Sequence, residues 1–501
     1  MRADIQKPIE LGVARDGSYG WVPLAMLAVG VPWGIWSFAT LLGGGGSQSV
    51  EFGAAAGWFV LLAFGYMGLH GLKGAAWWSV PVLMTLRSLL EFVCMPVWRF
   101  ATGDDLLDSV YVHAMVLTVI GFAAFWVGSL VFMKETKLRF VPEVRGRSSR
   151  VAFVSVAMLG LGLGANLVMW KFGLLSYMAD AGTRESSLGF LQWLGTCANL
   201  LNAALVVSAI EVFGERPTEP LMKIVFWLSV VFSIGFGALS GMKAELLKPL
   251  LCLVIVYGIT KGRIPRTAIL LPLLLVLIYP FVNAYRTNLN NGYRAQVNTV
   301  GGLGAVLEKS FEDVVDAPFS TNEQAGKSFD QSTARISALT SVHDIIGLPY
   351  PSLLNGDEKV WLAPIYPLVP RFLWKGKPVL NKGQRLSQAL GRPDTTSSAV
   401  TPIGDLYSLY GTSGVVVGML IFGICLQLYM NRAGGGVISE KGLFVYISML
   451  PALTNIENDA VAVVSGAVQM GLILLVTSYI IYGRSDSSSG FAKYRSSTAA
   501  S

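Results

Sequence analysis

The stretch VYVHAMVLTVIGFAAFWVGSLVFM occupies residues 110–133 and contains no Asp, Glu, Lys or Arg. A helix that crosses a bilayer needs roughly 20 predominantly apolar residues, because each residue adds about 1.5 Å along the axis. This run meets that requirement alone, and similar runs recur on both sides of it. Their repetition predicts a helical membrane protein.

The composition of the whole chain supports this class. Hydrophobic residues make up 53% of the 501 positions and charged residues 14%, whereas soluble chains carry about 25% charged residues. The mean hydropathy is +0.56. A net charge of +7 is then expected mostly in cytoplasmic loops, so it does not indicate a nucleic-acid partner. The four cysteines fall inside apolar runs, which predicts packing roles and no disulfide framework.

The apolar runs predict an all-α polytopic integral membrane protein with about twelve transmembrane helices. The predicted spans are 20–42, 53–71, 76–98, 110–133, 151–170, 191–212, 224–241, 246–260, 267–285, 411–430, 442–456 and 461–482.

The basic residues predict the orientation of these spans. They gather in the connections 134–150 and 261–266 and in the C-terminal tail, and such residues prefer the cytoplasmic side. Twelve spans with both termini cytoplasmic place all three basic segments inside. The same count places the acidic turn 104–108, the turn 455–459 and the interval 286–410 outside.

The chain is thus divided into four parts. Residues 1–285 carry nine spans, 286–410 form one large extracytoplasmic loop, 411–482 carry three spans, and 483–501 form a disordered tail. The loop contains two amphipathic patterns, at 303–316 and 330–346, which we expect as short helices on the outer membrane–water boundary.

Arg87 and Glu91 lie four residues apart in the third predicted span, so they share a helix face and can pair. Such a pair indicates either a site facing a polar cavity or a structural ion pair between helices. The outward loop also carries an excess of cations. A diphosphate ligand would account for them, because guanidinium groups bind phosphate oxygens, and so would an ordinary solvated basic surface. The sequence has no phosphate-binding glycine loop and no metal-ligand motif, so no metal or cofactor is predicted.

Four blocks of the chain resemble a known family, the bacterial oligosaccharide repeat-unit polymerases (the Wzy-type O-antigen and exopolysaccharide polymerases). The blocks are Ser240-Gly241-Met242-Lys243, Ser332-Thr333-Ala334-Arg335-Ile336-Ser337, Pro370-Arg371-Phe372-Leu373-Trp374-Lys375-Gly376-Lys377-Pro378, and Thr401-Pro402-Ile403-Gly404-Asp405-Leu406-Tyr407. The third is similar to a recurring Pro-Arg-x-x-Trp-x-x-Lys-Pro pattern. The resemblance covers residues from about 224 to 430, and Lys243 stands where the family more often has arginine.

The resemblance implies a GT-C-like, metal-independent membrane glycosyltransferase in the bacterial inner membrane. Its substrates would be undecaprenyl-diphosphate-linked oligosaccharides delivered to the periplasmic side by a flippase. The growing chain would be transferred from its lipid carrier to a new repeat unit, giving O-antigen, capsule or exopolysaccharide. Membrane lipids, the flippase and a chain-length regulator are the implied partners.

Such a transfer needs cations for the departing diphosphate and an acceptor for the proton of the attacking hydroxyl. The candidate diphosphate-binding residues are Arg335, Arg371, Lys377, Arg286 and Lys243. The candidate bases are His343, Asp344 and Asp405.

Three other functions compete with the polymerase. A ligase would move finished glycan from the same lipid to another acceptor. A transferase with a polyprenyl-monophosphate donor commonly has an acidic residue in its first outward loop, where this chain offers only Glu51. A flippase or other transporter would usually show similar halves, whereas here one long loop makes the halves unlike.

Overall fold

A computed structural model describes the chain in the ranges 48–72, 79–102, 107–133, 139–140, 148–175, 178, 194–214, 218–261, 265, 281–282, 284–289, 291–315, 337–369, 373–374, 376–392, 397–433 and 437–482. The long helices are α2 (Gln48–Leu72), α3 (Val80–Leu89), α4 (Met95–Thr102), α5 (Ser109–Val131), α6 (Ser148–Lys171), α8 (Leu200–Phe213), α9 (Pro220–Leu239), α10 (Lys243–Lys261), α16 (Pro402–Ala433), α17 (Glu440–Leu453) and α18 (Ala460–Tyr482).

Further elements lie between these helices. The π-helix η2 (Leu90–Cys94) joins α3 to α4 without a break. Between 291 and 392 lie η5 (Tyr293–Ala295), α12 (Val300–Val315), α14 (Ala338–Ile346), η6 (Pro351–Leu354), η7 (Val360–Leu362) and α15 (Lys382–Ala389). The strands β1 (Arg139–Phe140) and β2 (Val437–Ile438) form one short parallel pair.

Eight helices within the described ranges are long and apolar enough to cross a membrane. They are Gln48–His70, Val80–Phe100, Ser109–Val131, Arg150–Lys171, Leu194–Phe213, Pro220–Leu239, Pro402–Ala433 and Ala460–Tyr482. Each corresponds to a predicted span, so the helical class is confirmed.

The other four predicted spans have different outcomes. The span 20–42 and most of 267–285 lie outside the described residues. The spans 246–260 and 442–456 form α10 and α17, but neither helix is among the eight. α10 begins with Lys243, Glu245 and Lys248 and contains Pro249, while α17 has only 14 residues.

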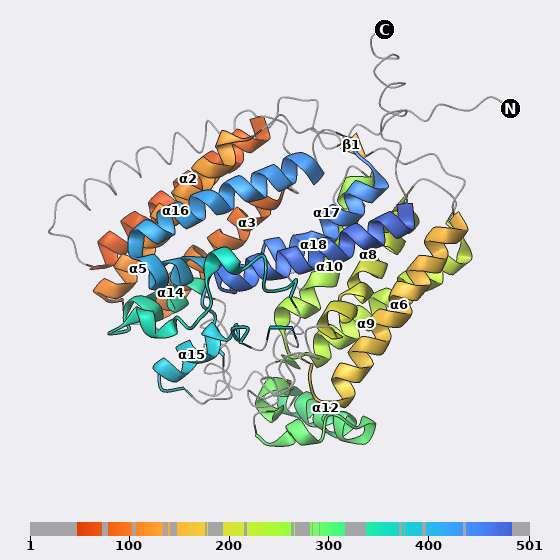
Figure 1. Ribbon diagram of the computed structural model, residues 1–501. Coiled ribbons are helices and arrows are strands. Elements are labelled where there is room, and N and C mark those ends of the chain that lie inside the picture. The colour runs from red at the N-terminus through yellow and green to blue at the C-terminus, as the bar shows by residue number, and fades with distance from the viewer. Residues whose placement is uncertain are drawn as a thin grey trace, which may run out of the picture.

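The most extensive helix pair is α5 with α16, which run side by side in Figure 1. Two glycines allow their backbones to approach closely. A Cβ atom on Gly128 would meet the Leu420 carbonyl oxygen, and one on Gly423 would meet the Phe125 carbonyl oxygen, both far inside contact distance. Small residues at such crossings are the usual means by which membrane helices pack without a hydrophobic driving force.

α16 is longer than the predicted span because it contains a kink. Gly411 has φ 64° and ψ −155° inside the helix, a backbone conformation that glycine adopts without a steric penalty. The helix therefore starts at Pro402 and changes direction at Gly411, where the predicted span 411–430 begins. Residues 402–410 belong structurally to the loop.

Contacts between distant segments join connections between spans that the pattern of basic residues predicts to lie on the same side of the membrane. The β1–β2 pair brings the connection after α5 to the connection after α16, both predicted inside. The indole of Trp170 donates to the Val297 carbonyl at 2.8 Å, and the Val400 N–H donates to the Glu457 carbonyl at 3.2 Å. Both of these contacts join segments predicted outside.

The two amphipathic patterns of the loop form helices at α12 and α14. Part of each apolar stripe packs against protein, while Phe311 and Val315 of α12 are exposed, and the expected position on the membrane–water boundary stays a prediction. Val306 of α12 is buried with Tyr285, Leu289 and Val297. Leu339 and Val342 of α14 are buried in the main core with helices α5 and α16. These buried residues thus attach the loop to the helix bundle, which removes their apolar surface from water.

We expect Gly423→Ala to destabilise the protein by about 1–3 kcal/mol, because the added methyl group forces α5 and α16 apart. The apparent unfolding temperature in detergent would fall. Gly466→Ala on α18 is the matched control, since nothing lies within 4 Å of its Cβ position. Equal unfolding temperatures for the two variants would show that the α5–α16 crossing is looser than described.

Candidate functional site

An imidazole held between two carboxylates lies where α14 meets the start of α5. The Nε2 atom of His343 is 3.2 Å from Asp108 Oδ2, and its Nδ1 atom is 3.4 Å from Asp344 Oδ1. The ring stacks on Tyr111, with centroids 3.8 Å apart and planes 16° from parallel. Only a protonated imidazole can donate to both carboxylates, so this geometry favours the imidazolium form of His343.

Local structure explains why these groups meet. Asp108 caps α5, since its side chain accepts the Tyr111 N–H at 2.8 Å. Ser337 caps α14 in the same way through the Thr340 N–H. Both caps satisfy backbone donors that a helix start leaves without partners. They fix the start of α5, where Asp108 lies, and the start of α14, which carries His343 in its last turn.

The pKa values of the pair move apart. For His343, partial burial lowers the pKa, but the carboxylates of Asp344 and Asp108 outweigh it and raise the pKa above its ordinary value. For Asp108, slight burial raises the pKa, but the Tyr111 N–H and His343 outweigh it and lower the pKa. A neighbouring opposite charge favours the charged form of each group, so both shifts act in the direction of an imidazolium–carboxylate pair.

Asp108 is the accessible member of this cluster. Its side chain is 50% exposed, against 22% for His343 and 15% for Asp344. Arg392 binds the other oxygen of Asp344 at 2.9 Å. Arg99 donates to the Thr340 hydroxyl at 3.1 Å, one turn from His343 on α14. We name Asp108, His343, Asp344, Arg392 and Arg99 the outer cluster.

Asp405 lies in a different, buried charge network. Its side chain is fully buried and pairs with the Lys382 ammonium group, and its Oδ2 accepts the Ala460 N–H at 2.9 Å. Glu358 binds Arg385 at 2.6 Å and lies 4.0 Å from Lys382. With both oxygens engaged and no access to solvent, Asp405 holds structure in this arrangement and is not placed to receive a substrate proton.

Asp459 borders this network at the start of α18. It caps the helix through the Ala462 N–H at 2.8 Å. Burial first, and then the nearby Asp405 charge, raise the pKa of Asp459 to about 6, although the Ala462 N–H acts in the opposite direction. A like charge in a buried site disfavours ionisation.

The predicted diphosphate-binding residues are only partly described. Arg335 and Arg371 lie outside the described residues, as does the side chain of Lys243. Lys377 is buried, and its ammonium group donates to the Val369 carbonyl at 3.1 Å. Arg286 is half-buried. The Tyr285 hydroxyl donates to the Leu239 carbonyl at 3.1 Å, so the chain at Arg286 runs beside the turn that precedes Lys243.

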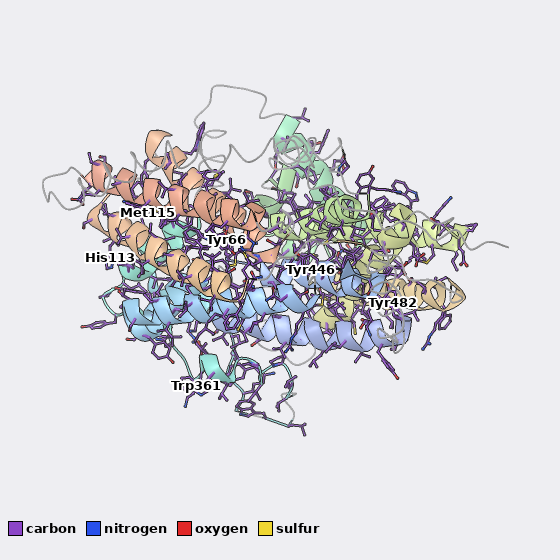
Figure 2. The ribbon with its side chains drawn as sticks, turned by 90° about the horizontal axis from the view of Figure 1, so that it is seen from above. Tyr66, His113, Met115, Trp361, Tyr446 and Tyr482 are labelled. Atoms are coloured by element: carbon purple, nitrogen blue, oxygen red, sulfur yellow. The ribbon has the colours of Figure 1, made fainter. Side chains whose placement is uncertain are left out.

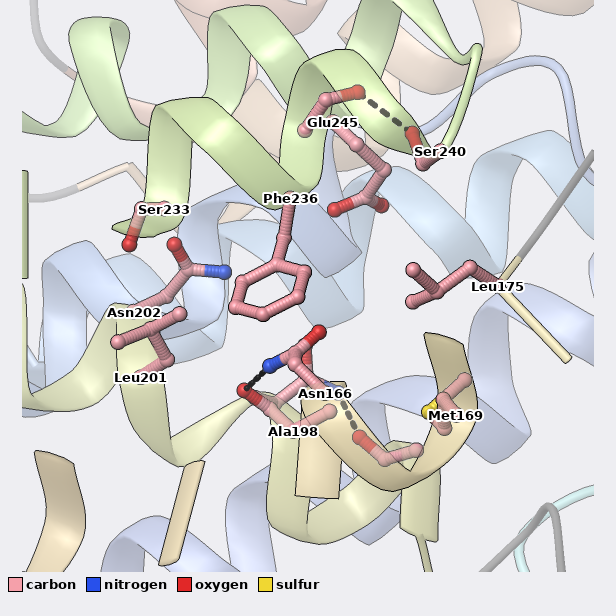
Figure 3. Close-up of a pocket in the computed structure, with 13 residues that line it drawn as sticks. Asn166, Met169, Leu175, Ala198, Leu201, Asn202, Ser233, Phe236, Ser240 and Glu245 are labelled. Atoms are coloured by element: carbon pink, nitrogen blue, oxygen red, sulfur yellow. Dashed lines mark hydrogen bonds between the residues drawn. The ribbon is translucent and has the colours of Figure 1, made fainter. Parts of the chain in front are cut away.

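That turn lines a polar pocket of about 160 Å³ between α6, α8, α9 and α10. Figure 3 shows the side chains of Asn166, Asn202, Ser233 and Glu245 around the ring of Phe236. The Asn166 amide nitrogen donates to the Gly162 carbonyl at 2.8 Å and to the Ala198 carbonyl at 3.3 Å. Figure 1 places these helices away from α14, so the pocket and the outer cluster are separate features.

The block at 370–378 contributes to a second pocket, of about 470 Å³. It is lined by Gly356, Asp357, Lys359, Leu362, Tyr366, Trp374, Gly376 and Pro378. Arg371, Phe372 and Lys375 of the block lie outside the described residues.

The predicted pairing of Arg87 with Glu91 is confirmed, at 2.6 Å. Arg87 also binds Glu457 at 2.7 Å and the Thr454 carbonyl at 2.9 Å. It therefore joins α3 to the turn between α17 and α18. Of the two predicted roles, this contact agrees with a structural ion pair between helices.

Sequence reasoning missed Asp108, Lys382 and Glu358. Asp108 was visible only as part of an acidic outward turn, although an Asp directly before a long apolar run is a typical helix cap. No local pattern identifies Lys382 and Glu358 as partners of Asp405, because they lie 23 and 47 positions away along the chain. Within the described ranges, no group of three or more His, Cys, Asp or Glu side chains is arranged to hold a metal ion.

Comparison with known proteins identifies a family but no activity. A family model described as a domain of unknown function (DUF8712) matches residues 109–437, and the chain belongs to this family. No curated protein and no solved structure matches the chain.

We expect the docking of α14 on α5 to depend on pH. The contribution of ionised Asp108 to the stability of this docking is present above the ordinary aspartate pKa. It is lost as pH falls through the lowered pKa of Asp108. The His343 contribution is present below the ordinary histidine pKa and is lost as pH rises through the raised pKa. Protection of α14 amides from hydrogen exchange, corrected for intrinsic rates, should therefore be highest between about pH 4 and pH 6.5.

His343→Gln should remove the alkaline part of this dependence, and His113→Gln, on the exposed side of α5, should preserve it. A flat protection profile in the unmodified protein would contradict the ion pair.

Proposed function

We propose that this chain polymerises polyprenyl-diphosphate-linked oligosaccharide repeat units on the outer face of a bacterial inner membrane. The observation that carries the proposal is the outer cluster, where the long loop brings His343 onto Asp108 at the end of a predicted span. A proton acceptor at that position can meet a hydroxyl group whose carrier lipid remains in the bilayer. The sequence blocks similar to the repeat-unit polymerases give the substrate class.

In the proposed reaction, a hydroxyl oxygen of the new repeat unit attacks the anomeric carbon of the growing chain. The bond from that carbon to the diphosphate oxygen breaks, and the diphosphate leaves on its lipid with the bonding electrons. The hydroxyl proton passes to Asp108, the exposed carboxylate, while His343 orients Asp108 and keeps it ionised. This assignment replaces His343 by Asp108 as the proton acceptor and makes His343 a positioning residue.

The leaving diphosphate gains negative charge, which nearby guanidinium groups stabilise in a water-poor site. Arg392 is the exposed cation of the outer cluster, with a side chain 46% exposed. Arg335 precedes by two residues the cap of the helix that carries His343. Arg392 and Arg335 are therefore our first candidates for the diphosphate, with Arg371 retained from the family resemblance.

The family match supports the view that the loop and its docking helices form one unit. It runs from the first residue of α5 to the first residue of β2, and so includes α14, the whole loop and α16. A simple transporter would not require a long loop whose caps and charges fix a carboxylate–imidazole pair. A ligase shares this chemistry and is separated from the polymerase by its product.

We expect Asp108→Asn to lower polymer formation by about 10²–10⁴-fold, the usual cost of removing a general base. The amide still accepts the Tyr111 N–H, so the α5 cap is retained. The measurement is a gel of the surface glycan from cells that express the variant at the normal level. Single-repeat material should persist while the long-chain ladder disappears.

Asp357→Asn is the control, because Asp357 is an exposed carboxylate of the same loop outside the outer cluster. A normal ladder from Asp108→Asn would exclude Asp108 as the base. Loss of single-repeat material as well would point to a transporter, and finished polymer retained on the lipid carrier would point to a ligase.

A further inference from the structure

Exposed apolar side chains recur in the loop segment from Tyr350 to Leu373. Six large hydrophobic side chains in this part of the chain are each at least 42% exposed. They are Tyr350, Leu353, Trp361, Ile365, Leu368 and Leu373. We name these six residues the loop patch. In a water-soluble domain, a gathering of exposed apolar residues of this kind marks a surface that contacts something else.

The position of the loop along α18 indicates the membrane level at which the loop patch lies. Ala363 accepts a hydrogen bond from the Ser465 hydroxyl at 2.7 Å, and Ala363 and Tyr366 are buried against Val461. Ser465 is five residues beyond Ala460, the first residue of the span, and this corresponds to about 8 Å along the helix. The loop therefore descends beside α18 below the level at which that helix starts.

That depth matches the boundary between lipid headgroups and acyl chains. α18 has 23 residues, which gives about 34 Å, slightly more than the roughly 30 Å of the hydrocarbon core. A segment level with Ser465 then lies just inside the hydrocarbon edge. The side chains of Leu475, Val476 and Tyr479 on α18 are exposed among the described residues, as expected of a helix face that contacts lipid.

The chemistry of the loop patch also fits this level. Trp361 projects away from the helices at the edge of the molecule in Figure 2, and the Lys359 ammonium group lies 5.7 Å from the centre of its ring. Tryptophan and tyrosine are enriched at membrane interfaces, and a lysine there keeps its charged end among the headgroups. By contrast, the apolar face of α14 is buried against protein.

We propose that the loop patch inserts into the outer leaflet beside α18 and anchors the loop in the lipid surface. The anchor rests only on the membrane placement of α18, so it stands independently of the proposed enzymatic activity. Its occupant is the phospholipid bilayer itself, contacted at the level of the headgroups and the first acyl carbons.

The test is lipid quenching of a fluorophore on the loop patch. A single cysteine introduced by Trp361→Cys, in a chain whose four native cysteines are replaced by Ala, carries an NBD label. The protein is reconstituted in phosphatidylcholine–phosphatidylglycerol vesicles. A nitroxide at acyl position 5 should quench this label several-fold more strongly than it quenches a label at Ala389→Cys, an exposed position on α15. A nitroxide at position 12 should have a weaker effect.

Leu353→Cys provides a second label if the Trp361 variant does not fold, and the same quenching is expected there. Labels at both positions that respond no more than the Ala389 label would overturn the proposal. Labels shielded from lipid in a protein that elutes as a dimer would overturn it too, because the loop patch would then bind a second copy of the chain.

Discussion

The buried ion pair between Lys382 and Asp405 is the constraint on which the outer half of the structure depends. Both side chains are almost completely buried, and an unpaired charge at such depth costs several kcal/mol. Each charge therefore requires the other as its partner. Because Lys382 is on α15 and Asp405 is on α16, α15 has to lie against the start of α16. Because Asp405 also accepts the Ala460 N–H, the same pair sets where α18 begins.

Neighbouring contacts extend this constraint over the surface. The Val400 N–H donates to the Glu457 carbonyl, and the Glu457 side chain binds Arg87. α14 packs against α5 and α16, which brings His343 to Asp108. The loop is thus attached at several helix ends, and the position of the outer cluster follows from attachments that lie outside it.

Features that depend on local sequence pattern could be predicted from the sequence. Apolar runs located the eight long helices, because span length is fixed by bilayer thickness. The four-residue spacing of Arg87 and Glu91 was sufficient for their pairing. The kink at Gly411 was not foreseen, yet the predicted span began there because polar residues precede it.

Contacts between distant segments could not be predicted from the sequence. Asp405 looked like a candidate base because it is acidic and lies at the loop boundary, and only the structure shows that Lys382 and the α18 backbone engage it. The stripes of α12 and α14 have the same periodicity whether they face lipid or protein, so the burial of Val306, Leu339 and Val342 against protein could not be predicted. Asp108 became a candidate only when α14 was seen to place His343 beside it.

The account treats the outer cluster as a site of glycosyl transfer between two lipid-linked units. The most direct measurement reconstitutes the purified chain in liposomes with lipid-linked repeat units from cells that lack it, without any other protein. The account predicts a ladder of products that differ by one repeat unit and remain attached to the lipid carrier. Repeat units that keep their original length, on either face of the liposome, would contradict it.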